Sequence, residues 1–280
     1  MYGPLFIESD PFSPVGYVYR VKSVLHSSRS AYQQIDVLDT VHFGRVLVLD
    51  GVVQLTEKDE FFYHEMLAHV ALHAHPHPAR VAIIGGGDGG TLREVLKHES
   101  VREVHLIEID EQVIEVSTRF FPGLAAGFSD PRVHVHKMDA SDFVRQPGRA
   151  FDIVIVDCTD PVGVAEPLFD DGFFGAVSSL LHGEGIYVAQ TESLHFHRDF
   201  VADVQRRLSG VFATVDLYTT PLATYAGNWW TFSVASDACT PREPVRRCEV
   251  ATRYYDEQVH RAAFLPRSLY GKLVDNKLDW

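Results

Sequence analysis

Residues 81–90 read VAIIGGGDGG, and the segment TLREVLKH (91–98) follows directly. The apolar run at 81–84 predicts a buried strand, and TLREVLKH has the residues of a helix. Between them, Gly85, Gly87 and Gly90 fit the spacing G-x-G-x-x-G, which lets bare backbone approach a ligand. The segment therefore predicts a strand, a glycine loop and a helix, as in nucleoside-binding α/β folds.

A carboxylate ends the next predicted strand. The run VHLIEID (104–110) brings Glu108 to the same sheet edge as the glycine loop, where it can accept hydrogen bonds from ribose hydroxyls. Loop and acid together indicate a nucleoside ligand. They fit NAD as well as an adenosyl sulfonium, and a structural turn without a ligand remains an alternative.

Asp88 lies inside the glycine loop and narrows the choice of ligand. A fixed carboxylate there would repel a pyrophosphate, and also the amino-acid carboxylate of ordinary S-adenosylmethionine. It would pair well with a bare ammonium group. We therefore expect a cationic donor rather than a dinucleotide.

The rest of the chain places this loop in an α/β protein with two domains. Strand-like runs alternate with polar breaks between residues 17 and 56, which predicts a small β-meander domain over residues 1–60. Helical spacing begins at Asp59, and residues 61–280 then alternate strands with helices, which predicts a doubly wound, mostly parallel sheet. Strands are expected at 81–85, 104–110, 132–137, 151–157 and 185–190, with a pair near 213–218 and 229–236 and a helix over 253–264.

Acidic residues also follow the third and fourth of these strands. Asp139 can accept a hydrogen bond from an adenine amino group, cap the helix that starts at Ala140, or do both. Asp157 and Asp160 stand three residues apart after the fourth strand, where paired carboxylates hold a metal, bind a cation or accept protons. No further acidic cluster is aimed at this point, which favours a cation or a proton over a metal.

Composition excludes several classes of partner. A net charge of −13 disfavours nucleic acid, because phosphate binding depends on clustered Lys and Arg. No apolar run approaches the length of about 20 residues that a membrane span needs. The N-terminus has no secretion signal, and the three cysteines form no C-x-x-C pair, so we expect a cytoplasmic protein without disulfides.

Several histidines could suggest a metal site, and one cysteine could suggest a nucleophile. His69 and His73 have the i, i+4 spacing of a metal site, but we expect surface histidines on the helix that begins near residue 60 and no metal. Cys158 is expected to be a spacer in a tight loop, because neighbouring carboxylates raise the pKa of its thiol.

In order along the chain, VLVLDGVVQLTEKDEFFYHEMLAHV, GGGDGGTLREVLKH, IEID, MDA, VDCTDPVG and TRYYDEQVHRAAF resemble the polyamine aminopropyltransferases, in particular the spermidine synthases. The match covers nearly the whole chain, although Cys158 stands where serine is common and ATYAGNWW (223–230) replaces a TYPSG-like stretch. The resemblance implies a small N-terminal β-domain and a methyltransferase-like Rossmann domain.

The resemblance also implies roles for individual residues. Asp157 matches the acid that takes the proton of the amine, and Tyr63 matches the tyrosine beside it. The positions that match donor-binding residues are Gln33, Gln54, His64, Gly85, Gly87, Asp88, Glu108, Asp139 and Ala140. The positions that match the amine pocket are Asp157, Asp160, Gln190 and Tyr225.

The implied reaction is aminopropyl transfer from decarboxylated S-adenosylmethionine, a co-substrate, to putrescine, without metal or further cofactor. Cadaverine, agmatine or spermidine are alternative acceptors. An S-adenosylmethionine methyltransferase and a polyamine-binding module without activity are more distant alternatives, and Asp88 counts against methyl transfer. Relatives are commonly dimers or tetramers, so we expect a homodimer or homotetramer formed through the N-terminal β-region.

Overall fold

A computed structural model describes residues 3–9, 15–146, 148, 150–161 and 163–279. Its N-terminal part is a five-stranded antiparallel sheet in which each strand pairs with the next one along the chain. This confirms the small N-terminal β-domain. The strands are β1 (Leu5–Ser9), β2 (Gly16–Arg29), β3 (Gln34–Thr40), β4 (Arg45–Leu49) and β5 (Val52–Thr56). The sequence pattern missed β1, a short edge strand that pairs only with β2.

The larger sheet has seven strands in the order β11-β12-β10-β9-β6-β7-β8. Neighbours from β10 to β8 are parallel, and β12 is antiparallel to both of its neighbours. The predicted Rossmann-like, mostly parallel sheet is therefore confirmed. Its strands are β6 (Arg80–Gly85), β7 (Glu103–Ile107), β8 (Val133–His136), β9 (Phe151–Asp157), β10 (Leu181–Ser193), β11 (Thr214–Pro221) and β12 (Trp229–Ser236).

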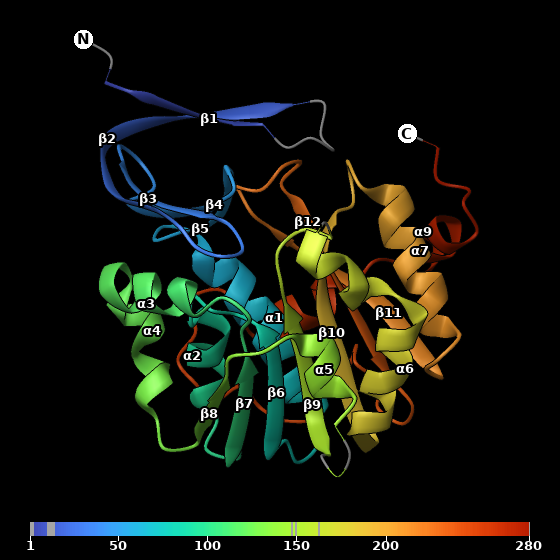
Figure 1. Ribbon diagram of the computed structural model, residues 1–280. Helices are drawn as coiled ribbons and strands as arrows, with labels where there is room; N and C mark the ends of the chain where they lie inside the picture. Colours follow the sequence, from blue (N-terminus) through green and yellow to red (C-terminus); the bar gives the residue numbers. More distant parts are fainter. Residues whose placement is uncertain (1–2, 10–14, 147, 149, 162, 280) are drawn as a thin grey trace.

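Helices cover both faces of this sheet, and the five-stranded sheet lies across one end of it (Figure 1). Along β9, Ile153 and Ile155 pack in the cluster that contains α1, whereas Val154 and Val156 pack in the cluster that contains α6. This alternation is why residues 153–156 of β9 are all apolar. The α-helices are α1 (Glu60–Ala74), α2 (Gly90–Leu96), α3 (Glu111–Phe120), α4 (Pro122–Ala125), α5 (Ala140–Val144), α6 (Asp171–Leu180), α7 (Arg198–Ser209), α8 (Glu257–Ala263) and α9 (Arg267–Val274), and 3₁₀ turns span Ala126–Ser129 and Gly163–Phe169.

The helix predicted over residues 253–264 begins later than expected. The Asp256 side chain accepts hydrogen bonds from the backbone N–H groups of Gln258 and Val259, so α8 starts at Glu257. The three preceding N–H groups donate instead to the buried carboxylate of Glu65 on α1. A long-range contact thus replaces the first turn of the predicted helix.

The expectation of surface histidines on α1 is wrong for most of the helix. His64, His69 and His73 are 2%, 0% and 1% exposed, and His75 just beyond the helix is 3% exposed. The helix is buried almost all round, because it packs on the sheet, on α2 and under the C-terminal segment. Within the described ranges, no helix is long and apolar enough to cross a membrane.

Candidate active site

The glycine loop connects β6 to α2 and lies against the carboxyl end of β9. Gly85 has a φ of +79°, and a side chain there would collide with the backbone carbonyl of Asp157. The next N–H, of Gly86, donates to that carbonyl at 2.8 Å. At Gly87 an added Cβ would lie 2.7 Å from Oε2 of Glu108. The glycines therefore bring the loop against the two predicted acids of neighbouring strands.

A cavity of about 130 Å³ opens at this edge, between the large sheet and the N-terminal sheet. It is lined by all of the predicted donor-site residues and by both predicted catalytic residues: Gln33, Gln54, Tyr63, His64, Gly85, Gly87, Asp88, Glu108, Asp139, Ala140 and Asp157, with Tyr225. The predicted residues Asp160 and Gln190 lie in an adjoining cavity of about 40 Å³. Gln54, Tyr63, Cys158 and Tyr225 line both cavities, which are therefore neighbouring parts of one site.

Asp157 lines the larger cavity, beside Tyr63 and Cys158, which line both cavities. Its Oδ1 accepts a hydrogen bond from the Tyr63 hydroxyl at 2.8 Å, and its Oδ2 accepts one from the Thr91 hydroxyl at 2.6 Å. Burial and the nearby Asp88 carboxylate raise the pKa of Asp157 to about 6. The carboxylate is thus fixed in position, ionised at neutral pH and poised to accept a proton.

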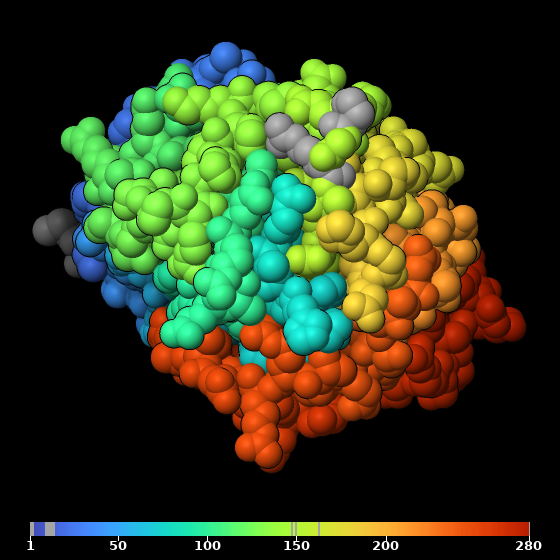
Figure 2. Space-filling model, turned by 90° about the horizontal axis from the view of Figure 1, so that it is seen from below, coloured from blue at the N-terminus to red at the C-terminus, as the bar shows by residue number. Residues whose placement is uncertain are grey.

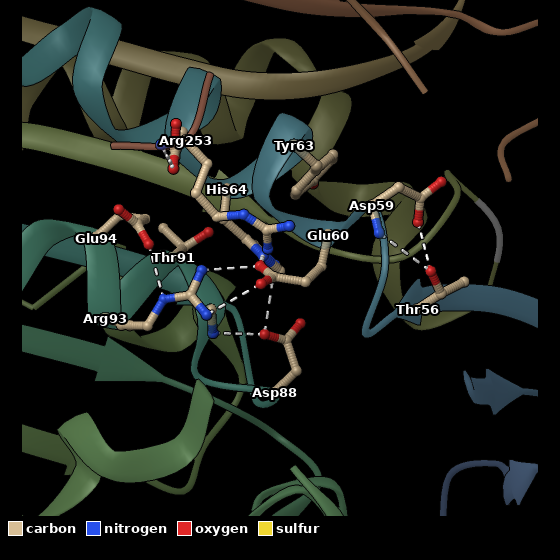
Figure 3. Close-up of polar contacts among 12 residues, drawn as sticks. Thr56, Asp59, Glu60, Tyr63, His64, Asp88, Thr91, Arg93, Glu94 and Arg253 are labelled. Atoms are coloured by element: carbon tan, nitrogen blue, oxygen red, sulfur yellow. Dashed lines mark hydrogen bonds and ion pairs between the residues drawn. The ribbon is translucent and has the colours of Figure 1, made fainter. Parts of the chain in front are cut away.

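Asp88 belongs to a chain of alternating charges, which Figure 3 shows. Its carboxylate lies 3.4 Å from Nε2 of His64, whose Nδ1 lies 2.7 Å from Glu60. The Arg93 guanidinium donates twice to Glu60. Burial opposes a charge on His64, but Asp88 and Glu60 outweigh it and raise the pKa of His64 to about 10. His64 is therefore a cation that holds Asp88 in place.

The nitrogen of His64 and the carboxylates of Asp88 and Asp157 come close enough together for a metal site. The chemistry of the three groups does not fit one. Both ring nitrogens of His64 face carboxylates, and a protonated imidazole has no lone pair for a metal. Both oxygens of Asp157 already accept hydrogen bonds. This end of the pocket is built for charged and proton-exchanging groups.

Glu108 lies at the end of β7, and its Oε1 accepts a hydrogen bond from the Asp110 N–H at 2.8 Å. Burial raises its pKa to about 7, with a further contribution from the Asp110 carboxylate. Hydrogen-bond donors on a bound ligand would therefore stabilise the ionised form of Glu108. Asp139 accepts from the Ser141 N–H at 2.6 Å, so it caps α5 while it also lines the pocket.

Three predicted glutamines have partners in the protein. The Gln33 amide donates to Asp110 at 2.9 Å, and the backbone carbonyl of Gln54 accepts from the Tyr225 hydroxyl. The Gln190 amide donates to the carbonyls of Cys158 and Thr159 and accepts from the Glu192 N–H. Gln190 therefore holds the loop that carries Asp160.

Sequence reasoning missed several residues of the site. Thr91 directly follows the glycine loop, and Glu60 stands one turn before His64, so both had a local signal. Glu8 and Glu192, which line the smaller cavity, come from distant segments that only the fold brings together. Burial, followed by the Asp157 carboxylate, raises the pKa of the Cys158 thiol well above its usual value, as expected for a spacer rather than a nucleophile.

Fold and site together define a Rossmann-like enzyme with an acidic pocket at the carboxyl ends of its parallel strands. Residues 60–244 match the family described as "Spermine/spermidine synthase domain", and residues 5–57 match the "Spermidine synthase tetramerisation domain". The chain belongs to the spermine/spermidine synthase family, whose members are transferases of polyamine biosynthesis.

Individual relatives agree over the full length. The chain is 52% identical to polyamine aminopropyltransferase 1 of Aquifex aeolicus, with 99% of both chains covered, and 47% identical to the polyamine aminopropyltransferase of Hydrogenobaculum, with 98% of both covered. It also superposes on spermidine synthase in complex with the transition-state analogue AdoDATO, with a TM-score of 0.93 and 37% identity over 98% of this chain and 95% of that one. The Thermotoga maritima spermidine synthase gives a TM-score of 0.92 and 36% identity, with 99% and 96% covered.

Proposed function

We propose that this enzyme transfers the aminopropyl group of decarboxylated S-adenosylmethionine to putrescine and releases spermidine and methylthioadenosine. The observation that carries the proposal is Asp157, a carboxylate in the larger cavity that accepts hydrogen bonds from two hydroxyls, one of them on Tyr63, which also lines the smaller cavity. An acid in that place can bind the ammonium of an amine and then take its proton.

The larger cavity is assigned to the donor. Glu108 would accept hydrogen bonds from the ribose hydroxyls, and Asp139 with Ala140 would line the adenine slot. Asp88 would pair with the ammonium of the aminopropyl chain. The similarity to an enzyme solved with AdoDATO supports this assignment, as does the acidity of the glycine loop. No cofactor beyond the co-substrate is required, because a sulfonium is already an activated leaving group.

The reaction then needs a neutral amine in line with the carbon attached to sulfur. An alkylammonium has a pKa of about 10.4, so the acceptor arrives as a cation. Asp157 takes one proton, and the nitrogen lone pair forms the new C–N bond. The C–S bond breaks, and its electron pair stays on sulfur to give the neutral thioether. Burial raises the pKa of Tyr63 well above its usual value, so its hydroxyl stays neutral and continues to donate.

The smaller cavity is assigned to the acceptor. Its carboxylates Glu8, Asp160 and Glu192 favour a second ammonium group, and Tyr225 and Trp230 supply apolar walls. A short diamine such as putrescine fits this arrangement, in which one nitrogen reaches Asp157 and the other lies among the acids. Cadaverine, agmatine and spermidine share a second cation and are the competing acceptors.

We infer further that residues 1–60 form an assembly domain and residues 61–280 a catalytic domain, and that the protein is a homotetramer or homodimer. The match of residues 5–57 to a tetramerisation domain supports this, as do the exposed apolar side chains of β1 and β2. Leu5, Ile7, Val18 and Val24 are 54–65% exposed. Light scattering coupled to size-exclusion chromatography would measure the assembly.

A direct test of the reaction is to incubate the enzyme and putrescine with decarboxylated or ordinary S-adenosylmethionine. The proposal predicts equal amounts of spermidine and methylthioadenosine with the first donor and little turnover with the second. Release of S-adenosylhomocysteine from the ordinary donor would indicate methyl transfer and refute it.

A further inference from the structure

Three buried imidazoles meet beside the core and take no part in the pocket described above. His69 and His73 lie one turn apart on α1, and His98 follows the end of α2. The three side chains belong to residues that are 0%, 1% and 2% exposed, and one nitrogen from each lies within 4.8 Å of the others. Only the fold reveals this set, because His98 comes from another element of the chain.

Hydrogen bonds decide which nitrogen of His69 faces the group. Its Nε2 lies 3.0 Å from a carboxylate oxygen of Glu94, which can only accept, so Nε2 carries the hydrogen. Burial disfavours the charge of Glu94, but His69, Arg93 and Lys97 lower its pKa below its usual value. The other nitrogen, Nδ1, then points its lone pair at Nε2 of His98, 2.9 Å away.

The same reasoning applies to His73. Its Nδ1 donates to the backbone carbonyl of His69 at 2.9 Å, which leaves Nε2 with the lone pair. A neutral imidazole with a free lone pair is the form in which histidine binds metals.

We propose that His69, His73 and His98 bind one Zn²⁺ ion. In metal sites, a ligating histidine characteristically donates its second N–H to a carboxylate or a backbone carbonyl. Here His69 donates to the Glu94 carboxylate, and His73 donates to the His69 backbone carbonyl. In a tetrahedral site with Zn–N bonds of about 2.0–2.1 Å, the nitrogens are about 3.3 Å apart. The three nitrogens lie within 4.8 Å of one another, and Nδ1 of His69 and Nε2 of His98, 2.9 Å apart, must separate slightly to bind the same ion. A water molecule would complete the coordination, as in other sites with three protein ligands.

Nearby charges act in opposite directions on such an ion. Glu94 favours it through His69, whereas the Arg246 guanidinium, which donates to the Leu72 carbonyl at 3.1 Å, opposes it. In the metal-free protein a proton lies between the close nitrogens of His69 and His98. For Nε2 of His98 to bind zinc, that hydrogen moves to Nδ1 of the same ring, so the neutral imidazole changes tautomer and no proton is lost.

The ion would join α1 to the end of α2, beneath a third part of the chain. The segment after β12 crosses the end of α1, where the N–H groups of Val245 and Arg246 donate to the His73 carbonyl, and the Tyr255 ring stacks on His73 at 5.0 Å. Figure 2 shows this orange-red segment against cyan and teal atoms of the chain just beyond α1 and α2. Zinc would therefore cross-link α1 and the end of α2 beneath the C-terminal segment, and this would stabilise the folded enzyme.

A second histidine group provides a matched control. Glu103, His105 and His134 also come within ligand distance, but His134 is exposed and Glu103 is engaged by Arg80 and His105. His134→Gln therefore removes a histidine from a different group of potential ligands and leaves the proposed site intact. His73→Gln and His98→Gln remove one proposed ligand each.

The test uses the tag-free, full-length enzyme after treatment with a chelator. Zinc content is measured after addition of one equivalent and gel filtration, and affinity is measured by competition with a chromophoric chelator. We expect one zinc per chain in the wild type and in His134→Gln, and affinity at least about 10-fold weaker in His73→Gln and His98→Gln. A wild type that retains no zinc, or an equal loss in His134→Gln, would overturn the proposal.

X-ray absorption at the zinc edge keeps the test independent of how the variants fold. The wild-type ion should show three imidazole ligands, and Co²⁺ in its place should give the intense visible bands of a four-coordinate site. Zinc bound by fewer than three imidazoles would overturn the proposal even if the stoichiometry were one.

Discussion

The substitution Asp157→Asn tests the proton acceptor. Asparagine keeps the shape of the side chain, and the hydroxyls of Tyr63 and Thr91 can still bond to it, so the fold and the donor site should remain. It cannot take a proton. At pH 7 an amine with a pKa of about 10.4 is neutral in about one molecule in 2,500, and the variant must rely on that fraction. We therefore expect turnover to fall by about 10²- to 10⁴-fold.

The pH profile sharpens this prediction. The wild-type kcat/KM should rise as Asp157 ionises near its pKa of about 6 and then level off. In the variant the rate should instead climb about tenfold per pH unit from 7 towards 10, as the neutral amine accumulates. Initial rates measured by methylthioadenosine release would show both profiles, with calorimetry of methylthioadenosine binding as the control for the site. Near-normal turnover, or a variant profile that is flat above pH 7, would refute the role of Asp157.

Three further substitutions test the rest of the site. Glu108→Gln should weaken methylthioadenosine binding by about 1–3 kcal/mol at pH 8. Calorimetry should also show that the wild-type affinity decreases when the pH is lowered below the Glu108 pKa of about 7, and that the affinity of the variant does not. Asp88→Asn should shrink the preference for the decarboxylated donor, which we expect to be at least about tenfold in wild type, and titration of both ligands measures it. Thr91→Val removes a hydrogen bond to Asp157, so the acid limb of kcat/KM should move up by about one pH unit; an unmoved limb would contradict this contact.

Local patterns were enough to predict most of the fold. The apolar run and glycines at 81–90 lie where β6, the loop and α2 form, and the acids Glu108, Asp139 and Asp157 lie at or just after the ends of β7, β8 and β9. These features depend on residues close together in sequence and on the rule that parallel strands share a carboxyl edge. Their gathering in one cavity follows from that rule.

What the sequence could not predict depends on contacts between distant segments. The positive charge on His64 requires Asp88 from the loop and Glu60 from its own helix. Nothing in the segment HEMLAH (64–69) predicts that His69 packs beside His98. The start of α8 was misplaced because Glu65 of α1 binds the preceding N–H groups. Burial of a helix on all sides is likewise set by its neighbours rather than by its own periodicity.

The most direct measurement of the central claim is a competition experiment with a known product for each acceptor. Decarboxylated S-adenosylmethionine is supplied in limiting amount with equal concentrations of putrescine, cadaverine, agmatine and spermidine, and the products are separated and identified by mass. We predict that spermidine is the major product and that total product equals the methylthioadenosine released. A different aminopropylated amine as the major product would contradict the assignment of putrescine, and the absence of any aminopropylated product would contradict the reaction itself.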